Sequence, residues 1–307
     1  MAFLENEVMI ERINALKKQL DAVILAHNYE LAEIQEIADY TGDSLELSIR
    51  ATQISARTIL FCGVTFMAET AKVLSPDKMV LIPDLQAGCT MANMADAETL
   101  RALKEKHPGA MVVTYVNSTA EVKALSDICV TSANAEKIVR QLPGDQEIIF
   151  VPDMNLGQNV INSTGRKMIL WDGFCPVHRR ITNEEIKRRK QEYPDAIVLA
   201  HPECNPSIAP LVDEFLSTGG ICNYVKNSSH DKFIIVTEMG IFHRLQKENP
   251  DKTFIVGSPQ AICPYMKLIR LEDVLRCLEK QQYQIELPAD LIEKAARPIR
   301  KMLELSK

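Results

Sequence analysis

Three cysteines stand in similar sequence surroundings, each with a glycine or a proline beside it. They are Cys89, Cys175 and Cys263, and their separations are 86 and 88 residues. Loops of this composition can turn a side chain into a pocket. Thiolates from three such loops suit two kinds of metal site. One is a zinc ion with an open catalytic position, and the other is a [4Fe–4S] cluster with one iron left free to bind substrate.

The other five cysteines fit a metal site less well. Cys62 and Cys129 lie in apolar segments typical of a buried core, and Cys277 lies in a predicted helix. Cys204 and Cys222 stand beside polar residues and remain the main alternatives as ligands or redox-active thiols. No pair of cysteines has the CxxC spacing, so a zinc ribbon or a ferredoxin-type binding run is not supported.

Polar residues recur with nearly the same period as the cysteines. Three predicted strands each end in a polar set, namely His27-Asn28-Tyr29, Tyr115-Val116-Asn117 and His201-Pro202-Glu203. Downstream of each set comes a turn of small polar residues, namely Gly42-Asp43-Ser44, Thr131-Ser132 and Ser217-Thr218. Equivalent residues in both series are 84 to 90 residues apart. This regularity predicts three copies of one structural unit.

Apolar strands alternate with helical stretches along the chain. The predicted strands lie near residues 22–26, 58–61, 79–82, 110–116, 147–151, 167–171, 196–200, 232–236 and 253–256. Buried parallel strands that alternate with helices are typical of α/β folds. We therefore predict an α/β protein of three homologous units, spanning residues 1–108, 109–194 and 195–307. Because function lies at the carboxyl ends of parallel strands, we expect the units to surround one central cavity about a pseudo-threefold axis.

Glu203 is the candidate general base. Burial of its carboxyl group between Pro202 and Cys204 would raise its pKa toward neutrality, although a solvated loop glutamate is the alternative. Tyr29 and Tyr115 could donate protons to leaving groups. A buried tyrosine whose hydroxyl is hydrogen-bonded also serves packing alone, so both interpretations stay open for the two tyrosines.

Several further polar residues have a structural and a functional interpretation. His178 follows Cys175 by three residues, so it could orient substrate, support a metal ligand or be structural. Ser44 and Ser132 each precede a predicted helix, where a serine caps the helix or helps to bind an anion. Neutral donors of this kind hold carboxylates or phosphate through several hydrogen bonds.

The composition argues against several classes of function. Of the 307 residues, 25% are charged and 46% hydrophobic, the formal net charge is -6, and no long Lys/Arg run occurs. This composition argues against nucleic acid as a partner. No apolar stretch reaches the roughly 18 residues of a membrane span, and the N-terminal stretch is unlike a secretion signal. We expect a cytoplasmic protein with reduced thiols. P-loop, dinucleotide-binding and nucleophile-elbow motifs are absent.

Taken together, these stretches resemble the quinolinate synthase family. The resemblance rests on the polar sets and turns above and on Phe66-Met67-Ala68-Glu69, Pro152-Asp153, Asn155-Leu156-Gly157, Cys175-Pro176-Val177-His178, His201-Pro202-Glu203-Cys204 and Thr237-Glu238-Met239-Gly240. It covers nearly the whole chain. In one departure, Thr90 follows Cys89 where many relatives have proline, which should alter the stiffness of the loop and not ligation.

The resemblance implies a triangular three-domain fold with one [4Fe–4S] cluster held by Cys89, Cys175 and Cys263. It implies condensation of iminoaspartate with dihydroxyacetone phosphate to quinolinate, phosphate and water in NAD biosynthesis. We expect Tyr29, Tyr115, His201 and Glu203 to be catalytic. The expected substrate-binding residues are His27, Ser44, Tyr115, Val116, Asn117, Ser132, His178, His201, Pro202, Glu203, Ser217 and Thr218. An enzyme that oxidises L-aspartate would supply the iminoaspartate.

Other functions compete with this one. A different cluster-dependent dehydratase would use the same open iron, and a zinc hydrolase would use the same cysteines. A cluster carrier or redox sensor without catalysis is the alternative from another class. A carrier needs an exposed cluster, however, and has no use for Tyr115, His201 and Glu203 around a closed pocket.

Overall fold

The computed structural model describes residues 2–307, with side chains from residue 6 onward. The chain forms two compact units. The first contains the chain up to Cys89 together with Cys263–Glu293, and the second contains Thr90–Ile262 together with Lys294–Lys307. Helix α14 (Ala289–Leu305) begins in the first unit and ends in the second.

The first unit holds one parallel sheet of four strands in the order β2-β1-β3-β4. Its strands are β1 (Ala22–His27), β2 (Tyr40–Gly42), β3 (Thr58–Cys62) and β4 (Met79–Leu81). Its helices are α1 (Ala2–Gln19), α2 (Ala32–Ile37), α3 (Ser44–Gln53), α4 (Thr65–Leu74), α13 (Leu271–Lys280) and the 3-10 helix η3 (Tyr265–Lys267). Every residue of β3 is buried, as expected for a parallel strand covered by helices on both faces.

The second unit holds two such sheets. The first has the order β6-β5-β7-β8 and contains β5 (Met111–Tyr115), β6 (Ile128–Val130), β7 (Ile148–Val151) and β8 (Ile169–Leu170). The second has the order β10-β9-β11-β12 and contains β9 (Ile197–Ala200), β10 (Glu214–Phe215), β11 (Lys232–Val236) and β12 (Thr253–Val256). All pairings are parallel.

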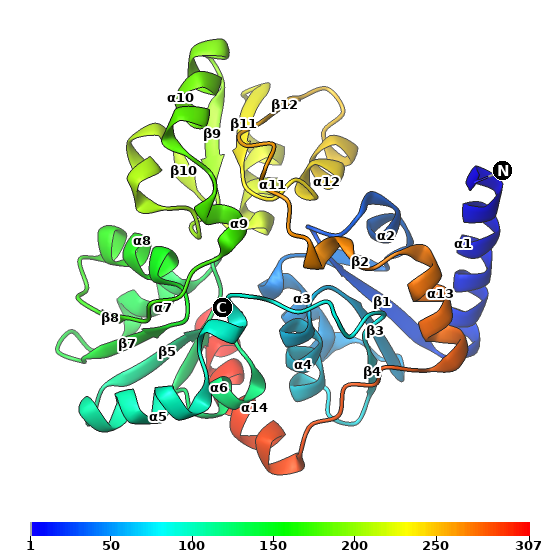
Figure 1. The fold of residues 1–307 in the computed structure, drawn as a ribbon, viewed down its shortest axis with the longest axis horizontal. Coiled ribbons are helices and arrows are strands. Elements are labelled where there is room, and N and C mark those ends of the chain that lie inside the picture. The colour runs from blue at the N-terminus through cyan, green and yellow to red at the C-terminus, as the bar shows by residue number, and fades with distance from the viewer. Residues whose placement is uncertain (1) are drawn as a thin grey trace. The chain divides into compact units, whose positions relative to one another are not determined.

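Helices flank both sheets of the second unit (Figure 1). Those that belong to the first sheet are η1 (Ala92–Met94), α5 (Ala97–Lys106), α6 (Ala120–Ala124), α7 (Ala135–Gln141), α8 (Met154–Thr164) and α9 (Pro176–Arg179). Those that belong to the second are α10 (Asn183–Glu192), η2 (Pro206–Leu211), α11 (Thr218–Asn227) and α12 (Ile241–Glu248). The predicted α/β class and the three homologous sheets are confirmed, because each sheet has the same strand order in chain sequence.

One reciprocal pair of hydrogen bonds recurs in all three sheets. In β1, β5 and β9, one backbone N–H donates to the side chain of an aspartate fifteen residues later in the chain. The three bonds run from Ile24 to Asp39 at 2.8 Å, from Val112 to Asp127 at 2.7 Å and from Val198 to Asp213 at 2.7 Å. The backbone N–H of each aspartate returns a bond of 2.9–3.0 Å to the carbonyl of the same strand residue. The aspartates are 88 and 86 residues apart, which is the period of the cysteines.

The sequence prediction missed one short strand in each sheet. All nine predicted strands occur, with ends shifted by at most two residues, but β2, β6 and β10 were not predicted. These strands have only two or three residues, too few to show a period. Residues 31–40, between the first two predicted strands, contain the six-residue α2 and the start of β2.

The domain boundaries predicted at residues 108/109 and 194/195, and the arrangement of the three units about one axis, stay predictions.

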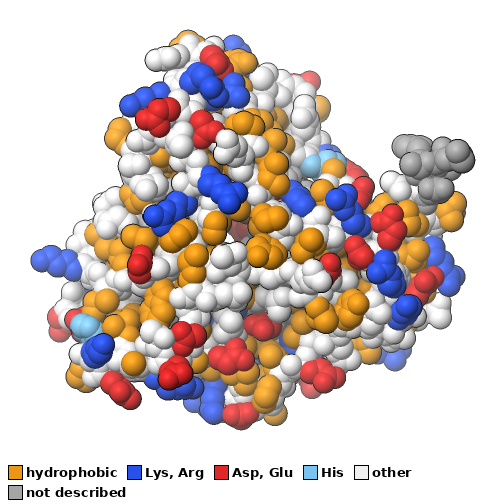
Figure 2. Space-filling view, viewed as in Figure 1, with side chains coloured by type: hydrophobic (Ala, Val, Ile, Leu, Met, Phe, Trp, Pro, Cys, Tyr) orange, Lys and Arg blue, Asp and Glu red, His pale blue; other side chains and the backbone are white. Residues whose placement is uncertain are grey.

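On the face shown in Figure 2, basic and acidic side chains are interspersed. Within the described part of the chain, no helix has both the length and the apolar composition needed to cross a membrane.

Candidate active site

Four of the predicted site residues surround the carboxylate of Glu203 in the second unit. Tyr115, the last residue of β5, donates its hydroxyl to Oε1 at 2.6 Å, and the side-chain amide of Asn117 donates to the same oxygen at 3.3 Å. Oε2 lies 2.8 Å from Nδ1 of His178 and 3.9 Å from Nδ1 of His201. Because the Glu203 side chain is only 5% exposed, these contacts replace solvent around a buried charge.

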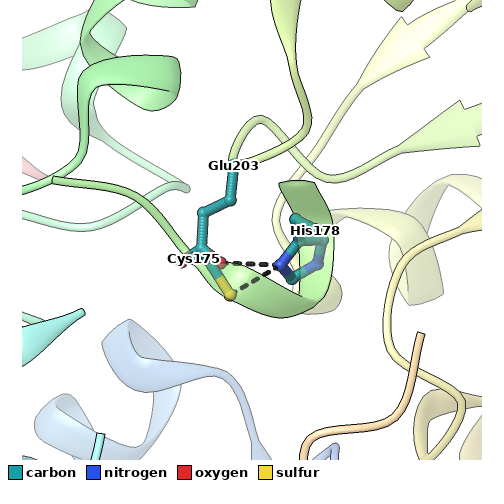
Figure 3. Close-up of side chains that lie close together, drawn as sticks. All are labelled: Cys175, His178 and Glu203. Carbon is teal, nitrogen blue, oxygen red and sulfur yellow. Dashed lines mark hydrogen bonds and ion pairs between the residues drawn. The ribbon is translucent and has the colours of Figure 1, made fainter. Parts of the chain in front are cut away.

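Cys175 and His178 reach this group from one short helix, α9. Cys175 occupies the N-cap position and Pro176 follows, which is the favoured first residue of a helix. Residues three apart lie on the same helix face, and Nδ1 of His178 is 3.2 Å from Sγ of Cys175. Figure 3 shows the thiol, the imidazole and the Glu203 carboxylate pointing toward one another. All pairs of these ligand atoms lie within 4.8 Å.

The turn after β9 orients His201. Its Nδ1 accepts the backbone N–H of Glu203 at 3.3 Å, and its Nε2 lies 3.2 Å from the hydroxyl of Ser132. The ring stacks on that of His178 with centroids 4.8 Å apart. Burial lowers the pKa of His201 to about 3; Glu203 opposes this effect and His178 adds to it. The imidazole is therefore neutral near pH 7, and Nε2 carries the proton toward Ser132.

The carboxyl group of Glu203 is ionised, which corrects the sequence-based expectation of a pKa raised toward neutrality. Burial does raise the pKa of Glu203. Electrostatic interactions with His201 and His178, and hydrogen bonds from His178 and Tyr115, outweigh burial and bring the pKa below its usual value. The sequence showed the apolar flanks of Glu203 but not the donors that other loops bring to it.

Helix α8 supports the turn that carries Glu203. Asp153 caps this helix by accepting the backbone N–H groups of Asn155 and Leu156 at 2.8 and 2.9 Å. The side-chain amides of Asn155 and Asn159, four residues apart on one face, then donate to the backbone carbonyls of Glu203 at 3.2 Å and of the residue before it at 2.8 Å. Two side-chain amides of α8 thus fix the backbone of the turn that carries Glu203.

Asp153 also joins α8 to the loop that leads to Cys175. It forms a parallel bridge with Gly173, and the backbone N–H of Met154 donates to the carbonyl of Gly173 at 2.8 Å. Burial and the charge of Glu203 raise the pKa of Asp153, while the surrounding backbone N–H groups lower it. Within the described residues, its Oδ2 is buried without a hydrogen-bond partner.

Thr237 is a site residue whose role the sequence did not reveal. It follows β11 directly, and its hydroxyl lies 2.8 Å from Nε2 of His178. Thr237, Asp153 and Asn155 were recognised as parts of family motifs, but no role was predicted for them. The signal that could have found them is their place just beyond the carboxyl ends of β7 and β11, where parallel sheets expose functional groups.

The first unit contains a second group of predicted residues, among them His27, which ends β1, and Tyr29, which follows it. Nδ1 of His27 accepts the backbone N–H of Tyr29 at 3.1 Å, and the two rings meet edge to face with centroids 4.7 Å apart. The carbonyl of Tyr29 accepts a hydrogen bond from the Lys267 ammonium group. Cys89 and Cys263 also belong to this unit.

The predicted serines differ in their roles. Ser44 is the first residue of α3, whose cap is Asp43, and Asn134 occupies the cap position of α7. Helix capping as the role of Ser44 or Ser132 is therefore wrong. Ser217, by contrast, caps α11 by accepting the N–H of Gly220 at 3.1 Å. The other predicted contributors, Val116, Pro202 and Thr218 of the second unit, are buried.

Exposure separates the predicted ligand cysteines from the others. Cys89, Cys175 and Cys263 are partly exposed, whereas the other five cysteines are buried. Burial, with the charges of Glu203 and Asp153, raises the pKa of Cys204, so this thiol is a poor ligand and a poor nucleophile. The three predicted thiols are thus those accessible to an inserted metal group.

Known proteins are similar to this chain along almost its whole length. The family model described as quinolinate synthetase A protein matches residues 11–304. Curated proteins named quinolinate synthase are similar over almost their whole length. That of Pelobacter propionicus is 52% identical over 299 residues, which cover 97% of this chain and 98% of the relative. Those of Geotalea uraniireducens and Geobacter metallireducens are 50% and 49% identical, covering 95% and 98% of this chain and 96% and 99% of theirs.

Proposed function

The chain belongs to the quinolinate synthase family, and from this premise we propose that it condenses iminoaspartate with dihydroxyacetone phosphate to quinolinate, phosphate and water. The reaction would serve NAD biosynthesis. The observation that carries the proposal is the buried carboxylate of Glu203, which receives Tyr115, Asn117 and His178 beside the thiol of Cys175. This group offers a base, proton donors and a metal ligand at one place.

The proposed cofactor is a [4Fe–4S] cluster held by Cys89, Cys175 and Cys263. These three cysteines are partly exposed, and the chemistry of three thiolates suits a cluster with one iron that lacks a protein thiolate. When bound, such a cluster supplies a Lewis-acidic iron that polarises a hydroxyl or carbonyl group. The hydrogen bond between His178 and Cys175 supports one ligand from outside.

Glu203 is the proposed general base. Its carboxylate is ionised and accepts a proton from the substrate, while the Tyr115 hydroxyl at 2.6 Å is the nearest group that returns one. Tyr29 of the first unit is the second proposed proton donor. An acid and a base placed as closely as Tyr115 and Glu203 contribute typically about 10²–10⁴-fold to a rate.

The neutral donors are the proposed anchors for carboxylate and phosphate groups. His201 remains neutral and shares its Nε2 proton with Ser132, so both side chains can turn hydrogen bonds toward an anion without adding charge. The other proposed substrate contacts are His27, Ser44, Val116, Asn117, His178, Pro202, Ser217 and Thr218.

An anaerobic preparation of the full chain tests this proposal. We expect iron and sulfide in a ratio of one to one, little zinc, and quinolinate formed from the two substrates. Cys175→Ser should lose the cluster and the activity together. Zinc without sulfide would favour a hydrolase. Dehydration of simple hydroxyacids without quinolinate would favour another dehydratase, and rapid transfer of the cluster to an apo-acceptor would favour a carrier.

The cellular setting is also proposed from the family. We infer that the protein acts in the cytoplasm, where thiols stay reduced. An enzyme that oxidises L-aspartate is the proposed source of iminoaspartate. The proposed source is tested by measuring quinolinate formation in two reactions. In one, iminoaspartate is produced in the same vessel by oxidation of L-aspartate, and in the other it is added preformed.

A further inference from the structure

We propose that Cys175, His178 and Glu203 form a mononuclear site for a divalent transition-metal ion of the zinc type, available when the cluster is not installed. This site shares Cys175 with the proposed three-cysteine cluster site but differs from it in its other ligands, so that all three of its ligands belong to the second unit. The inference goes beyond the proposed function; ion binding does not depend on that function, whereas the competition with the cluster rests on the proposed cofactor. Ion binding depends on the geometry of three side chains and on the residues that orient them.

The three ligand atoms are already gathered at one point. Nδ1 of His178 lies 3.2 Å from Sγ of Cys175 and 2.8 Å from Oε2 of Glu203. Around a tetrahedral ion with metal–ligand distances of about 2.0–2.3 Å, neighbouring ligand atoms are about 3.3–3.6 Å apart. The two pairs that His178 forms would therefore separate by roughly half an ångström as coordination replaces their hydrogen bonds. The Cys175 sulfur and the Glu203 oxygen, which lie within 4.8 Å of each other, would settle at about 3.6 Å.

The surrounding residues orient these ligands in the way that metal sites require. A histidine ligand almost always binds a second group through its other nitrogen, and Thr237 lies 2.8 Å from Nε2 of His178. Glu203 is oriented in the same sense, because Tyr115 and Asn117 occupy Oε1 and leave Oε2 directed at His178.

Charge and burial favour an ion of this class. One thiolate and one carboxylate balance the two positive charges of the ion, and the imidazole adds a neutral nitrogen. A set of one sulfur, one nitrogen and one oxygen suits zinc with a fourth position open. His178 and Glu203 are buried, whereas Cys175 is partly exposed and provides the route of entry.

Cys175 cannot hold both the ion and a cluster, so the two should exclude each other. A bound ion would also engage the carboxylate of Glu203. A chain that meets zinc before cluster assembly would therefore be held in a form that lacks a free base. Zinc would act as a competitor of cluster insertion at a single cysteine.

Cobalt provides a visible probe for this site. Co²⁺ is titrated into the full-length chain, freed of its cluster and kept without oxygen, and the thiolate-to-cobalt absorption band is recorded; Zn²⁺ is then added to displace it. We expect one Co²⁺ per chain with a band intensity of one thiolate. Cys175→Ser should abolish the band, and His178→Ala and Glu203→Gln should each raise the Kd for Co²⁺ at least 10-fold.

Matched variants separate this site from a three-cysteine site. Cys89→Ser and Cys263→Ser should leave both the band and the Kd for Co²⁺ unchanged. Thr237→Val should raise that Kd about 10–100-fold, and Thr237→Ser, which keeps the hydroxyl, should restore it. Circular dichroism of each variant confirms that the fold persists, and the Thr237 pair provides the test if a ligand variant does not fold.

Two results would overturn the proposal. One is the absence of a thiolate band in the wild-type chain, and the other is loss of the band in Cys89→Ser or Cys263→Ser, which would show that the three cysteines hold the ion together. Neither result concerns quinolinate formation, which is measured on the chain with its cluster. Failure of this inference and failure of the proposed function are therefore distinguishable.

Discussion

The turns after β1 and β9 share one backbone device and differ in what they present. In each, the histidine that ends or follows the strand accepts, through Nδ1, the backbone N–H of the second residue after it, at 3.1 Å for His27 and 3.3 Å for His201. The second residue is Tyr29 in one turn and Glu203 in the other. A repeated fold thus fixes the backbone of a site while its chemistry varies at one position.

Among the substitutions that test this comparison, we expect the largest loss of turnover at Glu203. Glu203→Gln keeps the shape of the turn but removes the negative charge that Tyr115 and His178 stabilise. Cluster absorbance should remain, while turnover should fall by about 10²–10⁴-fold. Steady-state assays and the visible spectrum, both recorded without oxygen, measure the two quantities. Near-normal turnover would remove Glu203 from the mechanism.

A smaller effect is expected at Tyr115, where the comparison is with Tyr29. Tyr115→Phe removes a 2.6 Å hydrogen bond to a buried carboxylate. A hydrogen bond to a charged group contributes about 1.5–3 kcal/mol, so we expect kcat to fall roughly 10–100-fold. The same change at Tyr29 should leave the Glu203 network intact. Equal spectroscopic and pH-rate responses of the two variants would contradict this difference.

The loops of Cys175 and Cys89 each contain a glycine, at positions 173 and 88, and these two glycines allow a structural comparison of the loops. A Cβ at Gly173 would lie 2.4 Å from the backbone oxygen of Pro152, whereas a Cβ at Gly88 would meet only a carbonyl oxygen at 3.8 Å. Gly173→Ala should therefore lower the free energy of unfolding by about 1–3 kcal/mol and reduce cluster content. Gly88→Ala is the matched control and should change neither. Thermal unfolding and iron analysis measure the outcome.

The smallest effects are expected at the three aspartates that repeat across the sheets. Replacing Asp127 or Asp213 with alanine leaves a strand N–H without its acceptor, which should cost about 1 kcal/mol. Asp39→Ala should cost a few tenths of a kcal/mol more, because Asp39 also pairs with Lys17 at 2.7 Å. Denaturant unfolding curves give the free energy of unfolding of the three variants. No change in any of them would show that these aspartate hydrogen bonds do not stabilise the fold.

The sequence sufficed for the repeat and for the residues that meet around Glu203. A period of 84–90 residues in cysteines and polar sets predicted three homologous α/β units, and residues chosen at strand ends, such as Tyr115 and Glu203, do meet. What it could not supply were contacts between distant loops. The ionised state of Glu203 depends on His178 and Tyr115, and the support from Asn155 and Thr237 depends on two further strands.

Helix α8 is fastened to two functional groups at once. Its first turn is bridged to Gly173 in the strand-like segment that leads to Cys175, and the side chain of Asn155 grips the carbonyl of Glu203. In a close-packed interior such connections transmit strain and do not absorb it. The Cys175 sulfur and the Glu203 carboxylate are therefore both positioned by α8. A displacement of this helix would shift the two groups together and leave the distance between them unchanged.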